Sequence, residues 1–231
     1  VLSITGASNI GANITSSGTQ TYGGAVTLSA NTTLTTSSDV ITFSDTVNSD
    51  STTRNLTLAT GGNSTEINFD GIVGGSNALG VISITGALDL NAAITSATSI
   101  AVSGASNLGA NVTTSGTQTY SGAITLSGAA RTLEGSTVQT TTINGAQNLT
   151  ITGNLDLNGV IGGSSAIGVF SVSGTSNLGA NVTTTGTQTY SGAVTLSADN
   201  TLTSSGNADI TFGTTTDGAQ ELTLVTTLSL I

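Results

Sequence analysis

Short segments in which apolar and small polar residues alternate follow one another along the whole chain. Typical examples are Val26–Leu28, Ile41–Phe43 and Leu56–Leu58, where Thr separates two apolar residues. An alternation with period two places the two sets of side chains on opposite faces of a β-strand. Gly, Asn, Ser and Asp fill the positions between the segments, and these residues form turns at low cost. The pattern therefore predicts many short strands, each with one buried face.

Long stretches of this pattern are nearly identical in sequence. Ser103–Ser127 closely matches Ser3–Ala30 and Ser171–Ala198, and all three contain the letters GTQTY. A second landmark, Gly71–Gly80, returns as Gly159–Gly168 and leads into a new copy each time. Internal copies of this kind indicate a solenoid in which each repeat stacks on the one before.

We expect one continuous unit over residues 1–231, with internal repeats over about 1–80, 81–168 and 169–231, the third incomplete. Three strands per turn give a coil of roughly 20 residues and about eleven or twelve coils. At the spacing of paired strands, about 4.8 Å, such a stack is a rod of roughly 55 Å.

The repeats differ in length in two places. Gly86 and Gly104 both occupy the place of Gly6, so the second repeat contains an additional segment of about one coil. The later part of the second repeat is shorter by about half a coil, and Arg131 and Glu134 interrupt the pattern there. We therefore expect a loop or a skipped strand around 129–138.

Composition supports an ordered all-β chain. Lys, His, Cys, Met, Trp and Pro are absent, and β-branched residues abound. Abundant Ser, Thr and Gly could indicate disorder, but an apolar fraction of 36% with regularly placed Val, Ile and Leu opposes that interpretation.

The charge excludes several classes of partner. Twelve carboxylates against Arg54 and Arg131 give a formal charge of −10, so no cationic surface is available for nucleic acid or an anionic membrane.

Without Cys there are no disulfides or thiolate metal sites. No apolar run approaches the roughly 20 residues of a membrane helix. The chain starts at Val1 with neither an initiator Met nor a signal segment, which we interpret as an internal piece of something longer.

Three motifs resemble those of the filamentous-haemagglutinin-like β-strand-repeat exoproteins of bacteria, which are large surface adhesins. They are GTQTYSGAVTLSA (186–198), TLTSSGNADITF (201–212) and VGGSNALGVISITG (73–86), and the resemblance covers essentially all 231 residues. It implies a right-handed parallel β-helix, in agreement with the usual hand of parallel crossovers. It also implies secretion across the outer membrane and a role in attachment, aggregation or biofilm. The amino-terminal secretion domain and the carboxy-terminal anchor of such proteins are missing from these 231 residues.

Tyr22, Tyr120 and Tyr190 occupy one repeat position. They could form a ladder that stacks on sugar rings, but the copies lie several coils apart. We favour half-buried strand residues with the hydroxyl group at the surface.

Asn recurs at turn-like positions, for example Asn9, Asn107 and Asn177, and Asn13, Asn111 and Asn181. Such side chains either hydrogen-bond along a solenoid or accept left-handed turn geometry, and both roles are structural. Seven Asn lie in N-x-S/T sequons, which a Thr-rich chain produces by chance and which are acceptors only where a glycosylating enzyme exists. They are Asn13, Asn31, Asn55, Asn63, Asn111, Asn148 and Asn181.

Carboxylates are densest at Asp39, Asp45 and Asp50. These lack the spacing of an EF-hand loop and the GGxGxD of calcium-binding β-rolls. Two carboxylates could act as acid and base in glycoside hydrolysis, but a chain with two Arg and no Lys or His has little with which to hold a uronic-acid polymer. We therefore expect no catalytic, cofactor-binding or metal-binding residue.

TxT triplets raise ice binding as a rival function, which requires the triplet on every successive coil of a flat face. The triplets instead recur at irregular intervals: Thr19–Thr21, Thr33–Thr35, Thr140–Thr142 and Thr201–Thr203. Outward Thr is also the ordinary choice on a solvated strand.

The sequence thus predicts a non-enzymatic stalk segment of an extracellular adhesin at the bacterial cell surface. Its partners would be neighbouring coils of the same longer chain, with glycans or proteins of a host or cell surface bound by other regions. The alternative is a subunit of an extracellular filament or sheath, assembled end to end through the open ends of the β-helix.

Overall fold

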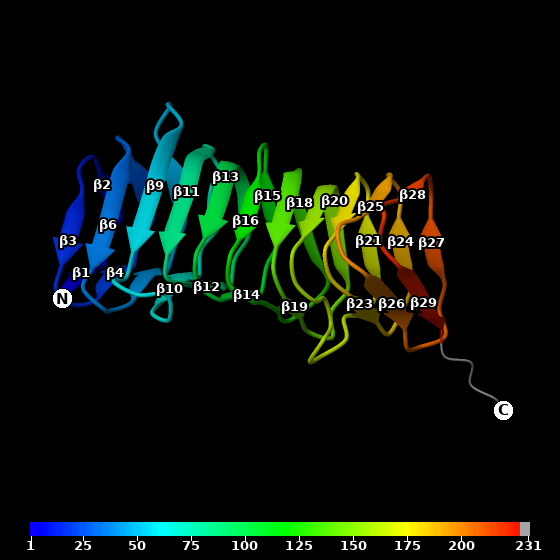
Figure 1. The fold of residues 1–231 in the computed structure, drawn as a ribbon. Helices are drawn as coiled ribbons and strands as arrows, with labels where there is room; N and C mark the ends of the chain where they lie inside the picture. The colour runs from blue at the N-terminus through cyan, green and yellow to red at the C-terminus, as the bar shows by residue number, and fades with distance from the viewer. Residues whose placement is uncertain (227–231) are drawn as a thin grey trace.

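The computed structural model describes residues 1–226, which contain no helix and are 54% strand. Paired strands run parallel, and partner residues lie about 20 positions apart, from 17 for Thr137 and Asn154 to 26 for Ile41 and Ile67. The chain therefore coils as a β-solenoid of about 11 turns, which confirms the predicted fold class. In Figure 1 the chain advances from left to right while β9, β11 and β13 on the near face point downward, so the coil is right-handed.

Each turn contributes one segment to each of three faces, named A, B and C in chain order. Face A begins with β1, and single-residue bridges through Ile161 carry it from β19 to β23. Its strands are β1 (Leu2–Ile4), β4 (Gln20–Tyr22), β7 (Ile41–Phe43), β10 (Glu66–Phe69), β12 (Ala87–Leu90), β14 (Ser106–Leu108), β17 (Ile124–Leu126), β19 (Ile143–Asn144), β23 (Val182–Thr184), β26 (Asn200–Ser204) and β29 (Leu222–Thr226).

Face B begins with β2 and passes through Val73, which bridges Val47 of β8 to Ile94 of β13. The strands that belong to face B alone are β2 (Ser8–Ile10), β5 (Val26–Leu28), β8 (Val47–Ser49), β15 (Val112–Thr114), β21 (Phe170–Val172), β24 (Gln188–Tyr190) and β27 (Ile210–Phe212). Face C follows, with β3 (Ile14–Ser16), β6 (Thr32–Thr36), β9 (Arg54–Ala59), β11 (Leu79–Thr85), β16 (Gln118–Tyr120), β22 (Ser176–Leu178), β25 (Val194–Leu196) and β28 (Thr216–Asp217).

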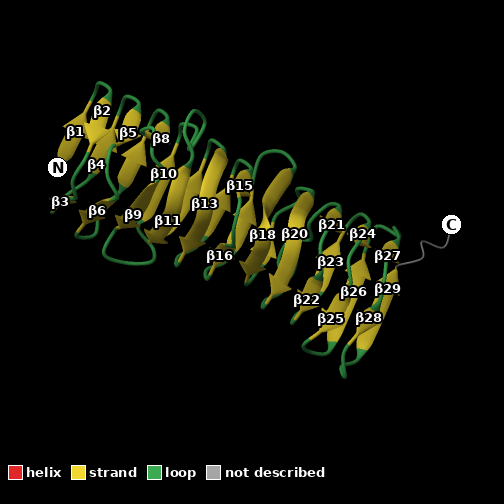
Figure 2. Ribbon diagram, turned by 90° about the horizontal axis from the view of Figure 1, so that it is seen from above, coloured by secondary structure: helices red, strands yellow, loops and turns green. Residues whose placement is uncertain are grey.

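Three long strands bend across the corner between faces B and C and contribute to both. They are β13 (Ile94–Val102), β18 (Arg131–Thr140) and β20 (Leu149–Leu157). The pairings of β13 with β15 and of β18 with β20 shift register where the strands bend. The loop or skipped strand expected around 129–138 is therefore wrong, because β18 is continuous over most of that range. This part of the second repeat is shorter because a bend in β18 replaces a corner loop. Figure 2 shows how far the corner loops of other coils project.

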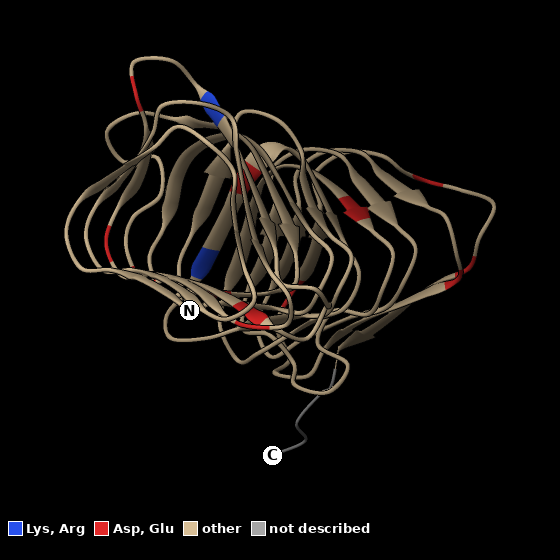
Figure 3. Ribbon diagram, turned by 90° about the vertical axis from the view of Figure 1, so that its left-hand side faces the viewer, with Lys and Arg blue, Asp and Glu red and all other residues tan. Residues whose placement is uncertain are grey.

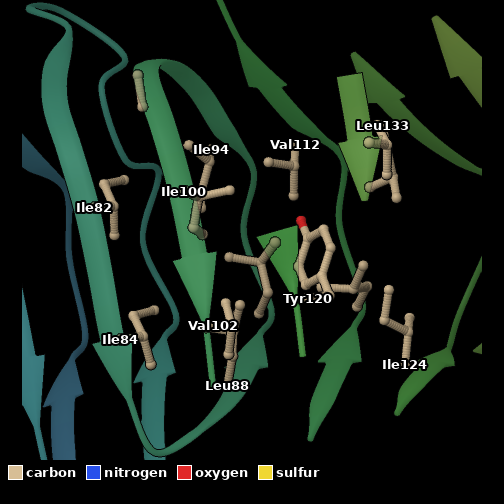
Figure 4. Packing of buried hydrophobic residues seen from close by; sticks show 14 of the residues in the cluster. Ile82, Ile84, Leu88, Ile94, Ile100, Val102, Val112, Tyr120, Ile124 and Leu133 are labelled. Carbon is tan, nitrogen blue, oxygen red and sulfur yellow. The ribbon is translucent and has the colours of Figure 1, made fainter. Parts of the chain in front are cut away.

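Inward side chains form one core that runs through all three repeats. The period-two pattern is visible in β4, where Gln20 and Tyr22 are buried and Thr21 is half-buried. Val, Ile and Leu of successive coils stack over one another, as Figure 4 shows for Ile82 and Ile100 on face C and for Ile94, Val112 and Leu133 on face B. The predicted boundary near residue 80 falls inside β11, so the core has no break where the sequence repeats.

The repeated motif lies on a different face in each copy. GTQTY forms β4 on face A, β16 on face C and β24 on face B. Counted as one segment per face, β16 lies 14 segments after β4, and β24 lies 11 segments after β16. Because a coil has three segments and neither number is a multiple of three, each copy falls on another face. On each of the three faces the motif forms a three-residue strand with the same buried Gln and Tyr.

Candidate functional site

The repeated tyrosines are buried inside the solenoid. Tyr22, Tyr120 and Tyr190 are at most 1% exposed, so the expected half-buried position with a surface hydroxyl is wrong. Each hydroxyl donates to Oε1 of the Gln two positions earlier, over 2.9 Å in the first copy and 3.1 Å in the other two. This internal partner, which the alternation of Gln20, Thr21 and Tyr22 places on the same inward side, removes the need for water.

Because the three tyrosines also lie on three faces, they cannot form a ladder for sugar rings. Phenylalanine rings also lie in the core: Phe43 stacks between Tyr22 and Phe69, with neighbouring ring centroids 5.1 Å apart. Among residues 1–226, every aromatic side chain is buried except Phe212, which is half-buried and stacked on Tyr190. The described surface therefore offers no exposed aromatic platform for stacking on a glycan.

Asn side chains join neighbouring coils at the corners. Oδ1 of Asn31 accepts from the backbone N–H of Asn55, and Oδ1 of Asn55 accepts from that of Val81, both over 2.9 Å. Asn13, Asn111, Asn148 and Asn181 bond the next coil in the same way. Oδ1 of Asn63 accepts from the hydroxyl of Ser103. All seven sequon asparagines thus bond along the solenoid, which confirms the first of the two structural roles considered for Asn.

Asn9, Asn107 and Asn177 lie in the middle of strands β2, β14 and β22, so their assignment to turns is wrong. Among the described residues other than Gly, a positive φ occurs only at Asn207. The side chain of Asn107 points outward on face A and donates to Asp89 over 2.8 Å, and Asn91 bridges Asp89 to Asp70. Amides therefore separate these carboxylates on the outer surface of the rod.

Face C carries a similar polar column on its outer side. Thr119, Gln139, Asp156 and Asn177 occupy paired positions on successive coils. Gln139 and Asn177 both donate to Asp156, over 3.4 and 3.0 Å. A hollow of about 270 Å³ beside this column is lined by hydroxyl, amide and carboxylate side chains. These groups are suited to hydrogen bonds with neutral, hydroxylated molecules or water.

Two further hollows lie on the surface of the rod. One of about 330 Å³ is lined mainly by Thr, Ser and Ala, with Glu134 as its one carboxylate. Another of about 260 Å³ includes Asp199 and Glu221. Both carboxylates are exposed, and Oδ1 of Asp199 accepts from the backbone N–H of Glu221.

The remaining charges are scattered around the cross-section, as Figure 3 shows. Arg54 binds Asp50 over 2.8 Å, and its hydrogen bond, with that from the Thr52 backbone, lowers the pKa of the Asp50 carboxyl. Arg131 is buried and donates to the carbonyl oxygens of Leu108, Ala130 and Ser127. In the part of the chain that is described, no three His, Cys, Asp or Glu side chains are grouped in a way that could hold a metal ion.

The TxT triplets do not continue from coil to coil. Thr33 and Thr35 pair with Thr57 and Ala59 in the next coil. Thr201 and Thr203 likewise pair with Thr223 and Val225. In both of these triplets the second Thr is lost after one step, as the irregular spacing in the sequence predicts.

Comparisons with known proteins found no match to a family model, a curated protein or a solved structure. None of residues 1–226 belongs to a helix that is long and apolar enough to cross a bilayer. The sites in this rod are thus polar columns, shallow hollows and a buried set of Gln–Tyr pairs.

Proposed function

We propose that this chain is a stalk segment of an extracellular bacterial surface adhesin of the filamentous-haemagglutinin-like kind. One observation carries the proposal: a single hydrophobic cluster from Ile10 to Leu202, with parallel ladders on all three faces, makes the chain one uninterrupted rod. At about 4.8 Å per coil, 11 turns span roughly 50 Å. Such a rod holds whatever lies beyond it at a fixed distance from its anchor.

The outer surface suits a spacer. Outward positions carry Thr, Ser and Asn, and the sparse negative charge is separated by amides, as at Asp89 and Asn107. A polar surface of one sign favours solubility and discourages unintended association, including with nucleic acid. In this proposal the chain is not an enzyme, and affinity for glycans or proteins belongs to other regions of the full protein.

The proposal is tested in cells that make the complete protein. Antibodies to this segment should label intact, unpermeabilised cells. In-frame deletion of 86–103 removes one coil, because Leu88 and Ser106 are paired partners and Gly104 then takes the place of Gly86. We expect the shortened protein to reach the surface and to support attachment. If this deletion abolishes attachment while surface labelling is unchanged, the segment holds a binding site and is not a spacer.

The second candidate is a subunit of an extracellular filament or sheath. It is favoured by the end coils: among the described residues, β1, β2 and β3 each pair on one side, and so do β27 and β28. Unpaired edges recruit further strands. Sedimentation of the purified chain over a wide concentration range separates the candidates, because a spacer stays monomeric and a filament subunit polymerises.

A further inference from the structure

Three pairs of buried polar residues repeat the same hydrogen bonds at three places in the rod. We name them the corner locks: Gln20 with Tyr22, Gln118 with Tyr120, and Gln188 with Tyr190. Both members of each pair are at most 1% exposed, and no other Gln among the described residues is buried. Figure 4 shows Tyr120 pointing inward among the aliphatic side chains.

Each lock Gln donates through Nε2 to a backbone carbonyl oxygen 15 or 16 residues further along the chain. The acceptors are Thr35, Glu134 and Thr203, at 2.8, 2.7 and 2.8 Å. The same Nε2 atoms also approach the carbonyl oxygens of Ile14, Val112 and Val182, at 3.5, 3.1 and 3.4 Å. The Tyr hydroxyl donates to Oε1 of the same Gln, so both the NH2 group and the oxygen of the amide have hydrogen-bond partners.

The two carbonyls of a lock belong to strands that are stacked directly on each other. For the central lock, Val112 lies in β15 and Glu134 in β18, which are paired partners. The other two locks join β3 to β6 and β23 to β26 in the same manner. The Gln side chain therefore adds a hydrogen bond between neighbouring coils beside the backbone ladder at a corner.

Breaking a lock is more costly than breaking an ordinary coil contact. Separation of the two coils breaks the bond from Gln Nε2 to the carbonyl oxygen of the neighbouring coil, while the Tyr–Gln bond lies within one strand and holds the amide in position. A hydrogen bond in the low-dielectric core is electrostatically stronger than one at the surface. A solenoid opens from an end, one nearest-neighbour contact at a time. A coil pair with additional bonds is therefore a place where opening stops.

We propose that the corner locks are arrest points at which the solenoid stops unravelling under tension, so that the rod extends in blocks and not coil by coil. This concerns the rod itself and applies to a stalk and to a filament subunit alike. The locks divide the chain at Gln20, Gln118 and Gln188, which are 98 and 70 residues apart. Extended at about 3.3–3.6 Å per residue, these blocks release roughly 340 and 240 Å of chain, less the small length they occupy when folded.

The test is stretching of the whole 231-residue chain between handles at its two ends in optical tweezers. We expect the native chain to lengthen in two main steps that correspond to the 98-residue and 70-residue blocks. In Gln118→Leu the central arrest is lost, and the two steps merge into one of about 168 residues, or roughly 580 Å of extended chain.

Gln139→Leu is the matched control, since Gln139 points outward one coil above Thr119 and bonds only to surface side chains. This variant should keep both steps. Tyr120→Phe removes only the hydroxyl bond, and should shorten the pause at the central lock several-fold without removing it, which keeps the test informative if Gln118→Leu does not fold. Native chains without pauses at these lengths, pauses unchanged in both lock variants, or equal loss in Gln139→Leu would each overturn the proposal.

Discussion

A Cβ atom on Gly122 would lie 2.3 Å from the carbonyl oxygen of Gly104 in the neighbouring coil. The same contact occurs between Gly192 and Gly174, and Gly24 meets the backbone of Gly6 in the same way. The glycine that follows each GTQTY segment is therefore required by the closeness of two backbones at a corner.

Gly122→Ala should destabilise the chain by roughly 1–3 kcal/mol, because the added methyl group forces two coils apart and strains the backbone ladder. Urea unfolding followed by circular dichroism measures the change. Gly62→Ala is the control, since a Cβ there meets nothing within 4 Å. Equal stability of the two variants would show that the corner backbones are not in contact.

Ser106 faces inward between Leu88 and Ile124, and its hydroxyl has no hydrogen-bond partner among the described residues. Ser8 and Ser176, at the same repeat position, are in the same situation. Removing an unpaired buried hydroxyl should increase stability, so we expect Ser106→Ala to raise the free energy of unfolding by up to about 1 kcal/mol. Thr125→Ala, on the outward side of β17, should change it little; a loss of stability in Ser106→Ala would indicate a partner for the hydroxyl.

Burial raises the pKa of Tyr22 from 10.0 to about 12 and raises the pKa of Tyr120 and Tyr190 further. The folded chain favours the neutral form of each tyrosine more than the unfolded chain does. The stability that comes from this preference is fully present below pH 10 and is lost as the pH rises through 12. The chain has three Tyr and no Trp, so tyrosinate absorbance follows them directly. We expect little tyrosinate at pH 11 in the folded chain; complete titration near pH 10 with the fold intact would contradict the buried positions.

Asn55 accepts from the N–H of Val81 and gives its own N–H to Asn31. Asn55→Ala should cost about 1 kcal/mol, because the corner N–H of Val81 loses its partner. Asn55→Asp keeps an acceptor oxygen at this place and should cost less. Urea unfolding of the two variants measures the difference, and equal losses would mean that the side chain does not join the coils.

The sequence predicts the coil, and the structure adds how the coils are oriented. Alternation in segments such as Gln118–Tyr120 tells which side chains point inward, and the copies tell that the units stack. Neither tells on which of three faces a segment lies, because that depends on the number of strand segments between copies. The placement of GTQTY on faces A, C and B therefore required the structure.

The candidate site was harder to predict for a related reason. Tyr120 has a polar group that usually reaches the surface, and only the neighbouring Gln118 satisfies it inside. The alternation of Gln and Tyr in GTQTY, with Thr between them, is the signal that could have placed both side chains in the core. The strand at 131–140 was missed because Glu134 and Gly135 break the alternation where β18 bends around the corner.

Electron microscopy of the purified 231-residue chain at high protein concentration, combined with sedimentation, tests the central claim most directly. An uninterrupted, monomeric spacer predicts single rods of roughly 50 Å, from 11 turns at about 4.8 Å each. Continuous fibres that lengthen with concentration would contradict the stalk and identify the end coils as assembly surfaces.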